Sequence, residues 1–297
     1  MLRIENLNKS YDHRPVLRDI DLTVEPGTVF GLLGPNGMGK TTLLNCIAGV
    51  ITPDGGRITY EGRDLLTDFD LKQRLGYVDE HLNYYAGFRV DDLVRFFRMT
   101  YSNWSDDRHK QLRKVFDLPA GERVKNLSKG MRTQLGLLLN LSMMPEILLL
   151  DEPTSGLDPV VRQKVLNIIV DQVASSGTAV LIANHNTHEL ERLCDAVAFI
   201  KDGEIVLNEE LDVLRQQLIK VQVIFEDHIP AEIADHTHLL SVERLGRMYT
   251  LVGRSELLPL LRECDTVHLE SVDTSLEEIY IQYMEGLNDE QDQSAAS

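Results

Sequence analysis

The sequence predicts an α/β protein with a largely parallel sheet, followed by a smaller C-terminal α+β domain. Three apolar runs of strand length, TVFGLLG, EILLLDEP and TAVLIANH, alternate with segments of helical periodicity, a pattern typical of parallel sheets. A glycine-rich loop joins the first of these strands to an apolar helix. Acidic residues concentrate toward the C-terminus, which indicates a boundary between two domains near residues 208–220.

The remaining elements are predicted in chain order. LRIENLNKSY and DIDLTVEPG alternate as short strands, and GKTTLLNCIAGV is the helix that follows the loop. GGRITYEGRDL is expected to form a hairpin at a sheet edge, residues 91–140 are mostly helical in pattern, and AVAFIKDGEIV turns at Asp202-Gly203. Beyond residue 208, KVQVIFED, LLSVERLG, RMYTLVG and TVHLESV alternate like strands, while SELLPLLREC and SLEEIYIQYMEGL are amphipathic helices.

Composition limits the classes of function. The net charge is -17, and residues 211–297 carry 17 acidic against 6 basic side chains, which disfavours a sequence-independent grip on DNA or RNA. No apolar run reaches the roughly 18 to 20 residues that span a bilayer, and the N-terminus lacks a signal-peptide run. We therefore expect a chain that is cytoplasmic or docked on a membrane by a partner. Cys46, Cys194 and Cys264 form no CxxC pair and are expected to be reduced thiols. The polar residues 288–297 are expected to form a disordered tail.

The strongest chemical signal is GPNGMGKT, residues 34–41, which fits the pattern of a phosphate-binding loop. Its glycines let backbone N–H groups surround a polyphosphate at a helix N-terminus. Lys40 would neutralise the β- and γ-phosphates, and Thr41 would offer its hydroxyl to Mg2+. A glycine-rich turn that merely joins strand to helix is the alternative, and the strand before and helix after the loop disfavour it.

A second signal is ILLLDE, an apolar strand that ends in two carboxylates. Asp151 is predicted to hold Mg2+ directly or through water, and Glu152 to polarise the water that attacks the γ-phosphate. Alone, such a strand end is equally consistent with two carboxylates facing solvent. Together with the phosphate loop it favours a nucleotide-hydrolysing site.

The order of motifs resembles that of the ATP-binding cassette (ABC) ATPases. The phosphate loop, LSKGM, ILLLDEPTSGLDP and a lone NH after a strand carry this resemblance over residues 1–207. It implies a P-loop NTPase (RecA-like) cassette with an antiparallel β subdomain and a helical subdomain at about residues 88–142, binding ATP and Mg2+. Residues 208–287 would be a C-terminal accessory α+β domain, as in some exporter-type ABC subunits.

The resemblance also implies a role for LSKGM. In this family the serine and glycine at that helix start bind the γ-phosphate of the ATP held by another subunit, so that two cassettes close head to tail. Ser128 and Gly130 are the matching residues here, and the helix dipole suits an anion at this end. Ser128 is also suited to be an ordinary helix N-cap, and the two roles are compatible.

Further site residues are implied one at a time. Tyr11 matches the aromatic that stacks on adenine, although a tyrosine in a strand is also typical of packing. His185 matches the switch histidine that supports the catalytic Glu152, although a histidine after a strand is often a packed or capping residue. Asp158 matches the loop that touches the opposite cassette. The residues implied to contact ATP in the phosphate loop are Gly34, Pro35, Asn36, Gly37, Met38, Gly39, Lys40, Thr41 and Thr42.

Two sets of positions depart from the common family pattern. Glu80, in GYVDEH, stands where the family usually has a glutamine that links Mg2+ to the membrane subunit, so the implied metal ligands are Thr41, Glu80 and Asp151. Lys129 and Met131 replace the glycine and glutamine of LSGGQ. An extra carboxylate would tighten or distort metal binding, and Lys129 would alter the approach to the partner's phosphate. Hydrolysis is still expected, because the other motif residues are present.

The sequence therefore predicts the ATP-hydrolysing subunit of a membrane transporter, of the exporter type. Its expected partners are a second cassette, identical or related, and an integral-membrane permease that docks near residues 80–88 and the helical insert; nucleic acid is not expected. The chain would lie on the inner face of the cell membrane. A soluble ABC ATPase acting on ribosomes or DNA is the alternative, although neither a second cassette nor a coiled-coil insert is visible. A P-loop GTPase is disfavoured because the chain lacks an Asn-Lys-x-Asp motif.

Overall fold

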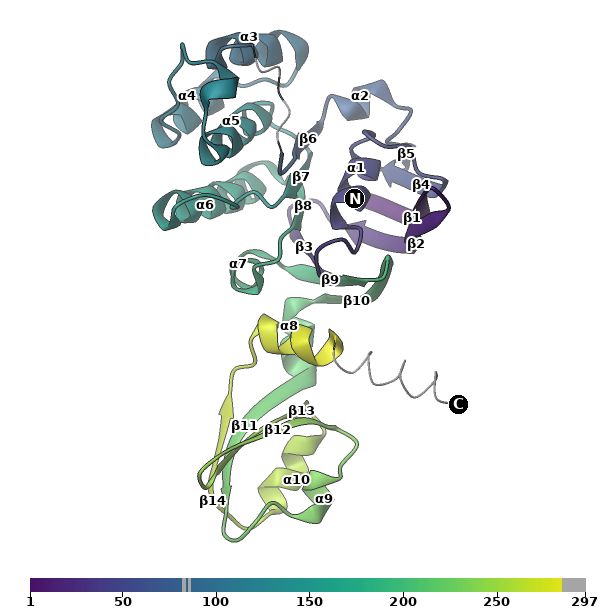
Figure 1. Ribbon diagram of the computed structural model, residues 1–297, viewed down its shortest axis with the longest axis vertical. Helices are drawn as coiled ribbons and strands as arrows, with labels where there is room; N and C mark the ends of the chain where they lie inside the picture. The colour runs from purple at the N-terminus through teal and green to yellow at the C-terminus, as the bar shows by residue number, and fades with distance from the viewer. Residues whose placement is uncertain (82–83, 85–86, 285–297) are drawn as a thin grey trace. The chain divides into compact units, whose positions relative to one another are not determined.

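The computed structural model describes residues 1–81, 84 and 87–284, and its contacts divide the chain into two compact units (Figure 1). The first unit comprises Met1–Asn186 and Leu193–Asn208, and the second comprises Thr187–Arg192 and the chain from Glu209 onward. The tail predicted at residues 288–297 lies outside the described residues. No helix within them combines the length and the apolar character that a bilayer crossing requires.

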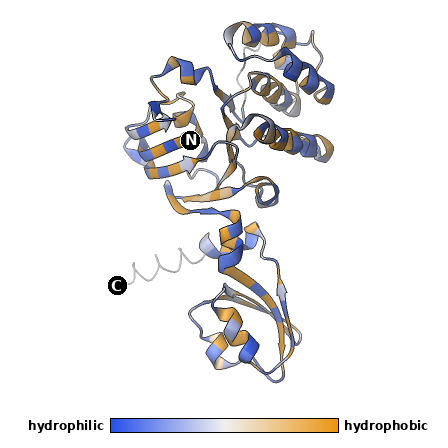
Figure 2. Ribbon diagram, turned by 180° about the vertical axis from the view of Figure 1, so that it is seen from behind, coloured by the Kyte–Doolittle hydropathy of each residue, from blue (hydrophilic) through white to orange (hydrophobic). Residues whose placement is uncertain are grey.

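The first unit begins with an antiparallel sheet in the order β2-β1-β4-β5. Its strands are β1 (Leu2–Tyr11), β2 (Arg14–Val24), β4 (Gly55–Tyr60) and β5 (Arg63–Asp64), and α2 (Phe69–Lys72) follows the last of them. Hydrophobic and hydrophilic residues alternate along β1 and β2, as a sheet with one buried face requires (Figure 2). The hairpin predicted for GGRITYEGRDL is confirmed, because β4 and β5 pair antiparallel across Thr59 and Asp64.

The second sheet has the order β10-β9-β3-β8-β7-β6 (Figure 1). Its strands are β3 (Val29–Leu33), β6 (Leu75–Val78), β7 (Ile147–Asp151), β8 (Ala179–Ala183), β9 (Ala196–Lys201) and β10 (Glu204–Glu210). The pairs β6·β7, β7·β8, β3·β8 and β3·β9 are all parallel. The carboxyl ends of these strands therefore lie along one edge of the sheet. Asp202 and Gly203 both have positive φ, 50° and 82°, as the predicted tight turn between β9 and β10 requires.

Helix α1 (Lys40–Ile47) lies in the core shared by the two sheets. Its Leu43, Leu44 and Ile47 are buried in one cluster with Leu7 of β1 and Leu149 of β7. Each fully buried leucine or isoleucine contributes about 1.5–3 kcal/mol to stability. The start of α1, and with it the phosphate loop, is thereby anchored to both sheets.

Helices α3 (Val90–Thr100), α4 (Asp106–Val115) and α5 (Lys129–Ser142) confirm the helical pattern predicted over residues 91–140; a short 3-10 turn, Val124–Asn126, precedes α5. Asn140 of α5 is buried and accepts from the backbone N–H of Tyr77 at 3.0 Å, which ties α5 to β6. The long α6 (Pro159–Ser176) was not individually predicted. Its ends have clear chemical causes: proline occupies its first turn, and Gly177 ends it at φ 65°.

The second unit contains a sheet in the order β12-β13-β11-β14, and each neighbouring pair is antiparallel. Its elements are α8 (Leu211–Gln217), β11 (Leu218–Phe225), α9 (Ala231–Ala234), β12 (Leu239–Leu245), β13 (Met248–Arg254), α10 (Leu257–Glu263) and β14 (Thr266–Val272). All four predicted strands and the α10 helix are confirmed. Residues 276–284 are helical as well.

The helix at residues 276–284 packs within the second unit. Leu276 and Ile279 are each 1% exposed, which favours a core role for them over a partner surface. The unit also includes most of α7 (Thr187–Leu193). Glu191 of α7 accepts from the backbone N–H of Leu276 at 3.1 Å and lies 3.7 Å from Arg215. The second unit therefore incorporates a helix that follows β8 of the parallel sheet.

Candidate functional site

The phosphate-binding loop is formed where β3 ends and α1 begins. All five residues of β3 are buried, and the loop's last residue, Gly39, has φ 103° and precedes the first helical residue, Lys40. A Cβ at Gly39 would lie 2.8 Å from a methyl group of Leu17, and one at Gly34 would lie 2.5 Å from the carbonyl oxygen of Ile200. Glycine is therefore needed at both positions, and the loop lies tightly against β2 and β9.

Lys40 is the one basic side chain among the residues that line the pocket over this loop. Its ammonium group donates to the carbonyl oxygens of Gly34 at 2.6 Å and Pro35 at 3.1 Å. The side chain is only 7% exposed, and burial lowers the pKa of Lys40 although Glu152 and Asp151 act in the opposite direction. A buried ammonium group beside a glycine-rich loop is well placed to neutralise a bound phosphate.

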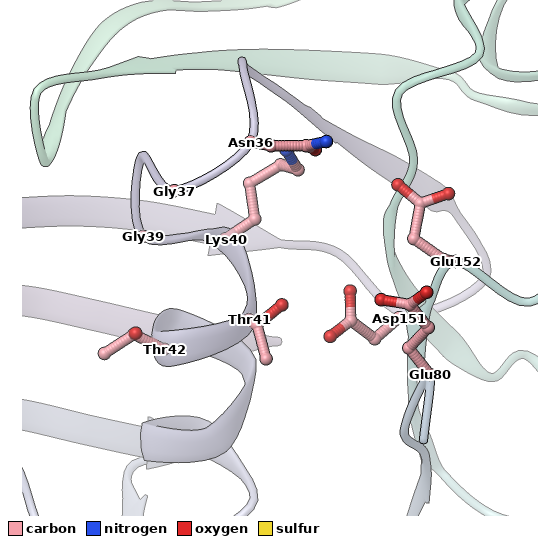
Figure 3. Close-up of a pocket in the computed structure, with 9 residues that line it drawn as sticks. All are labelled: Asn36, Gly37, Gly39, Lys40, Thr41, Thr42, Glu80, Asp151 and Glu152. Carbon is pink, nitrogen blue, oxygen red and sulfur yellow. The ribbon is translucent and has the colours of Figure 1, made fainter. Parts of the chain in front are cut away.

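The opposite wall of the pocket is acidic. Asp151, the last residue of β7, and Glu152 face Lys40 and Thr41, and Glu80 enters from the segment after β6 (Figure 3). The remaining lining residues, Asn36, Gly37, Gly39 and Thr42, come from the loop and from α1. The pocket thus lies at the carboxyl ends of β3, β6 and β7, the edge where an open parallel sheet ordinarily binds its ligand.

Asp151 carries the features of a cation ligand. It is 2% exposed, and its Oδ2 is buried without a hydrogen-bond partner among the described residues. Burial raises the pKa of Asp151 to about 6, although a hydrogen bond with Thr41 opposes the shift. The hydroxyl of Thr41 and the carboxylates of Asp151 and Glu80 form an all-oxygen donor set, which suits a hard cation such as Mg2+.

A metal at this position would need further ligands from a bound molecule. No group of three or more His, Cys, Asp or Glu side chains in the described part of the chain is arranged to hold a metal ion. Mg2+ ordinarily uses one or two protein carboxylates together with phosphate oxygens and water. The residues present therefore fit Mg2+ bound jointly with a nucleotide better than they fit a metal held by protein alone.

Glu152 lies beside Asp151 and contacts His185, which follows β8. The backbone N–H of His185 donates to Oε1 of Glu152 at 3.0 Å, and the His185 ring Nδ1 lies 2.8 Å from Oε2. Glu152 has φ 49°, an uncommon value for a residue with a side chain, and its own N–H donates to the carbonyl of Ala183 at 2.9 Å. This constrained backbone directs the carboxylate into the pocket, as a base that orients water requires.

Sequence reasoning missed one buried polar contact that supports this arrangement. Asn184 is 1% exposed, donates to the hydroxyl of Thr154 at 3.4 Å and accepts from the backbone N–H of Asn186 at 2.9 Å. It thereby links the segments that carry Glu152 and His185. The available signal was an amide side chain at the end of an otherwise apolar strand, because such a group needs hydrogen-bond partners when buried.

Ser128 and Gly130 do not line the pocket. The Ser128 hydroxyl accepts from the backbone N–H of Met131 at 3.2 Å, so it caps α5, and its side chain is exposed. A Cβ at Gly130 would lie 3.0 Å from the carbonyl oxygen of Gly156, which gives this glycine a packing role within the chain. Asp158 caps α6 by accepting from Val160 and Val161.

Five other predicted residues also lie outside the pocket lining: Gly34 and His185, whose contacts are given above, and Tyr11, Pro35 and Met38. Tyr11, at the end of β1, is 43% exposed, and the ammonium group of Lys9 lies 5.5 Å from its ring centroid. Pro35 lies in the loop, where its carbonyl accepts from Lys40. Met38 packs against the hydrophobic core, and its sulfur accepts from the backbone N–H of Asp202 at 3.4 Å. The structure therefore brings together the loop, Lys40, Thr41, Glu80, Asp151, Glu152 and His185, while Tyr11, Ser128, Gly130 and Asp158 do not line the pocket.

Known proteins share both the sequence pattern and the fold. The family model described as "ABC transporter" matches residues 17–155. The chain is 33% identical to the ABC transporter ATP-binding protein YtrB of Bacillus subtilis (strain 168), over 95% of this chain and 97% of that protein. It is 34% identical to the lantibiotic transport ATP-binding protein SrtF of Streptococcus pyogenes, over 76% of this chain and 99% of that protein. A solved ATP-binding subunit of an ABC transporter superposes with a TM-score of 0.67 at 27% identity, covering 73% of this chain and 92% of the other.

Proposed function

This chain belongs to the ATP-binding proteins of the ABC transporter family, and on that premise we propose that it hydrolyses Mg2+-bound ATP to power a separate membrane permease. The observation that carries the proposal is the meeting of Lys40, Asp151 and Glu152 around one pocket at the carboxyl ends of parallel strands. This arrangement supports the proposed roles of Lys40 as the cationic ligand of a phosphate, Asp151 as a metal ligand and Glu152 as a general base.

The residues around the pocket have separate proposed roles in binding the phosphates and the metal. The backbone of residues 34–39 surrounds the phosphates, and the ammonium group of Lys40 exchanges its two carbonyl partners for phosphate oxygens. The metal would be bound by Thr41, Asp151 and Glu80. When bound, Mg2+ supplies charge neutralisation on the phosphates. Pro35, Met38 and Thr42 shape the loop and its first helical turn.

Glu152 is the proposed general base. Its carboxylate accepts the proton of the attacking water, and His185 fixes its orientation through the backbone and ring contacts. A base held from two directions loses little orientational freedom when a water binds, which favours productive geometry. Ser128, Gly130 and Asp158 are proposed to serve the ATP of a second cassette, and Tyr11 to stack on the adenine.

We further propose that the permease works in export, with this chain on the inner face of the cell membrane. The similarity to SrtF, named for lantibiotic transport, supports this direction. The match to YtrB spans 95% of this chain and so includes most of the second unit, which supports treating that unit as part of the subunit.

The experiment that tests this function combines activity with location. The purified chain should hydrolyse ATP only when Mg2+ is present, and Lys40→Ala should abolish the activity while Lys125→Ala leaves it unchanged. In lysates of the native cell, a tagged chain should sediment with membranes and should be released by alkaline carbonate. Sedimentation with ribosomes instead, with no membrane protein recovered alongside it, would replace the transporter by the soluble alternative.

A further inference from the structure

We propose that Lys129 is a positioning residue that competes with the bound divalent cation for the carboxylate of Glu80. The proposal rests on the function given above, because it concerns the metal side of the same pocket. Its starting point is that two residues which depart from the usual family pattern, at positions 80 and 129, contact each other. The Nζ of Lys129 lies 3.0 Å from Oε1 of Glu80, across 49 residues of chain.

The contact is held in place from the Lys129 side. The same ammonium group donates to the hydroxyl of Ser155 at 3.0 Å. The aliphatic part of Lys129 lies against Gly156, where a Cβ would come within 3.4 Å of the Lys129 Cδ. A side chain fixed along its length and at its end loses less entropy on pairing than a free surface lysine does. The ion pair is therefore directed toward Glu80 by the surrounding segment.

Lys129 lies at a position where a nearby carboxylate is stabilising. It is the first residue of α5, and the first turn of α5 contains no acidic residue. The backbone N–H groups at a helix N-terminus carry partial positive charge, which makes a lysine unfavourable there. Glu80 supplies the negative charge from another part of the chain. The pairing thus offsets a repulsion that α5 itself does not relieve.

Glu80 faces two cation positions at once. Its carboxylate contacts Lys129, and the same residue lines the pocket beside Thr41 and Asp151, where the donor set fits Mg2+. One carboxylate shared in this way cannot satisfy both cations fully, so each weakens the hold of the other. Because the side chains of Lys129 and Glu80 are 50% and 32% exposed, the ion pair is weak enough for a divalent cation to displace it.

This competition links the pocket to the start of α5. When Glu80 turns to the metal, Lys129 keeps the Ser155 hydroxyl and loses its carboxylate partner. The freed charge then adds to the positive N-terminus of α5, one residue from Ser128, at the surface proposed to meet the second cassette's ATP. Metal binding in the chain's own site therefore makes that surface more attractive to phosphate.

The test measures metal binding rather than turnover. Mn2+ replaces Mg2+ and is titrated into protein carrying stoichiometric ADP, with free Mn2+ followed by electron paramagnetic resonance. ADP lacks the γ-phosphate, so closure onto a second chain does not contribute. Four variants are compared with the wild type: Lys129→Gln, Glu80→Gln, the double variant and Lys125→Gln. Lys125 is an exposed lysine four residues earlier, so its variant controls for the loss of one positive charge.

The expected pattern is specific to competition. Lys129→Gln should tighten Mn2+ binding roughly two- to fivefold, the range of an exposed ion pair. Glu80→Gln should weaken binding, the double variant should match Glu80→Gln, and Lys125→Gln should match the wild type. If Lys129→Gln tightens Mn2+ binding equally with and without the Glu80 carboxylate, the proposal is overturned. Lys129 would then act on the metal only by long-range charge repulsion. No tightening in the wild-type background would overturn it too.

Two further points keep the outcome clear. Lys129→Met keeps the aliphatic stem against Gly156 and replaces the Gln variant if thermal unfolding shows that the latter does not fold. If the wild-type protein with ADP binds no Mn2+, the proposed nucleotide function has failed. If it binds Mn2+ and the variants show no coupling between positions 80 and 129, only the present inference has failed.

Discussion

The carboxylate of Glu152 is held by His185 from two directions. The backbone N–H of His185 donates to Oε1 at 3.0 Å, while its ring Nδ1 lies 2.9 Å from Oε1 and 2.8 Å from Oε2. The Glu152 side chain is 11% exposed and that of His185 is 67% exposed. The histidine therefore covers the carboxylate from the solvent side, and the two residues are expected to act as a unit in hydrolysis.

Glu152→Gln should preserve nucleotide binding and lower turnover by roughly 10²- to 10⁴-fold, the usual contribution of a general base. The amide keeps the shape of the side chain but cannot accept the water's proton. Single-turnover hydrolysis and nucleotide titration on the same preparation measure both effects. His185→Ala should cost less, and the double variant should be no slower than Glu152→Gln, since residues that act as a unit are not additive. If the turnover losses of the two single variants multiply in the double variant, His185 does not act through Glu152.

Asp151→Asn should raise the thermal stability of the protein without nucleotide at pH 7.5 and abolish stabilisation by Mg2+ with ADP. The buried carboxyl has its pKa raised to about 6 by burial, so its charge opposes folding. This penalty is complete above about pH 6 and disappears as the pH falls toward the ordinary carboxyl range. The neutral amide lacks it. Asp107→Asn, at a side chain 89% exposed, is the matched control and should change neither property. A lower Tm for Asp151→Asn would contradict this account.

The part of the site that the sequence predicted depends on local patterns. Two such patterns are a buried strand before a glycine-rich loop and a buried strand that ends in Asp151 and Glu152. Both can be interpreted without knowledge of the tertiary fold. Asp158, Pro159 and Gly177 were equally local signals for the two ends of α6, and they were available although not used. The pairing of Lys129 with Glu80 joins residues 49 apart and depends on how α5 packs near β6, which periodicity does not specify. The inclusion of α7 in the second unit was beyond prediction for the same reason.

Tyr11→Ala should weaken the binding of ATP and ADP, if the ring stacks on adenine. Removing a base-stacking aromatic costs about 1–3 kcal/mol, or roughly 5- to 150-fold in affinity. Tyr11 is 43% exposed, so its ring is accessible to a ligand. Tyr11→Phe should retain affinity because it keeps the ring. Inorganic tripolyphosphate, which has no base, should bind wild type and Tyr11→Ala equally in a competition assay. An unchanged ATP affinity in Tyr11→Ala would remove this residue from the site.

Deletion of residues 212–297 should preserve nucleotide binding but slow hydrolysis. Helix α7 begins two residues after His185, and its Glu191 contacts Arg215 and the backbone of Leu276, both of which the deletion removes. Loss of these contacts should loosen α7 and, through it, the position of His185. Glu191→Ala removes the same contacts in the full-length chain and should slow hydrolysis in the same direction. If both variants hydrolyse ATP at the wild-type rate, the second unit has no part in positioning His185.

The last prediction separates the two roles of Ser128, as the cap of α5 and as a ligand for the phosphate of a second chain. In the Glu152→Gln variant with Ser128 unchanged, ATP should raise the mass measured by light scattering to that of a dimer, because the γ-phosphate bridges two chains. Ser128→Arg removes the cap and blocks the surface, so its failure to dimerise would not distinguish the roles. Ser128→Asp does distinguish them, since aspartate caps a helix as well as serine does but repels a phosphate.

We therefore expect Ser128→Asp to fold with near wild-type stability, to bind ATP as a monomer and to fail to dimerise. Ser105→Ala provides the matched control: Ser105 caps α4 by accepting from Arg108 N–H at 3.1 Å, so its loss costs about 1 kcal/mol of stability without touching the proposed interface. It should dimerise normally. If Ser128→Asp also dimerises normally with ATP, Ser128 acts only as a helix cap. The proposal that the start of α5 binds the phosphate of a second chain is then wrong, whatever result Ser128→Arg gives.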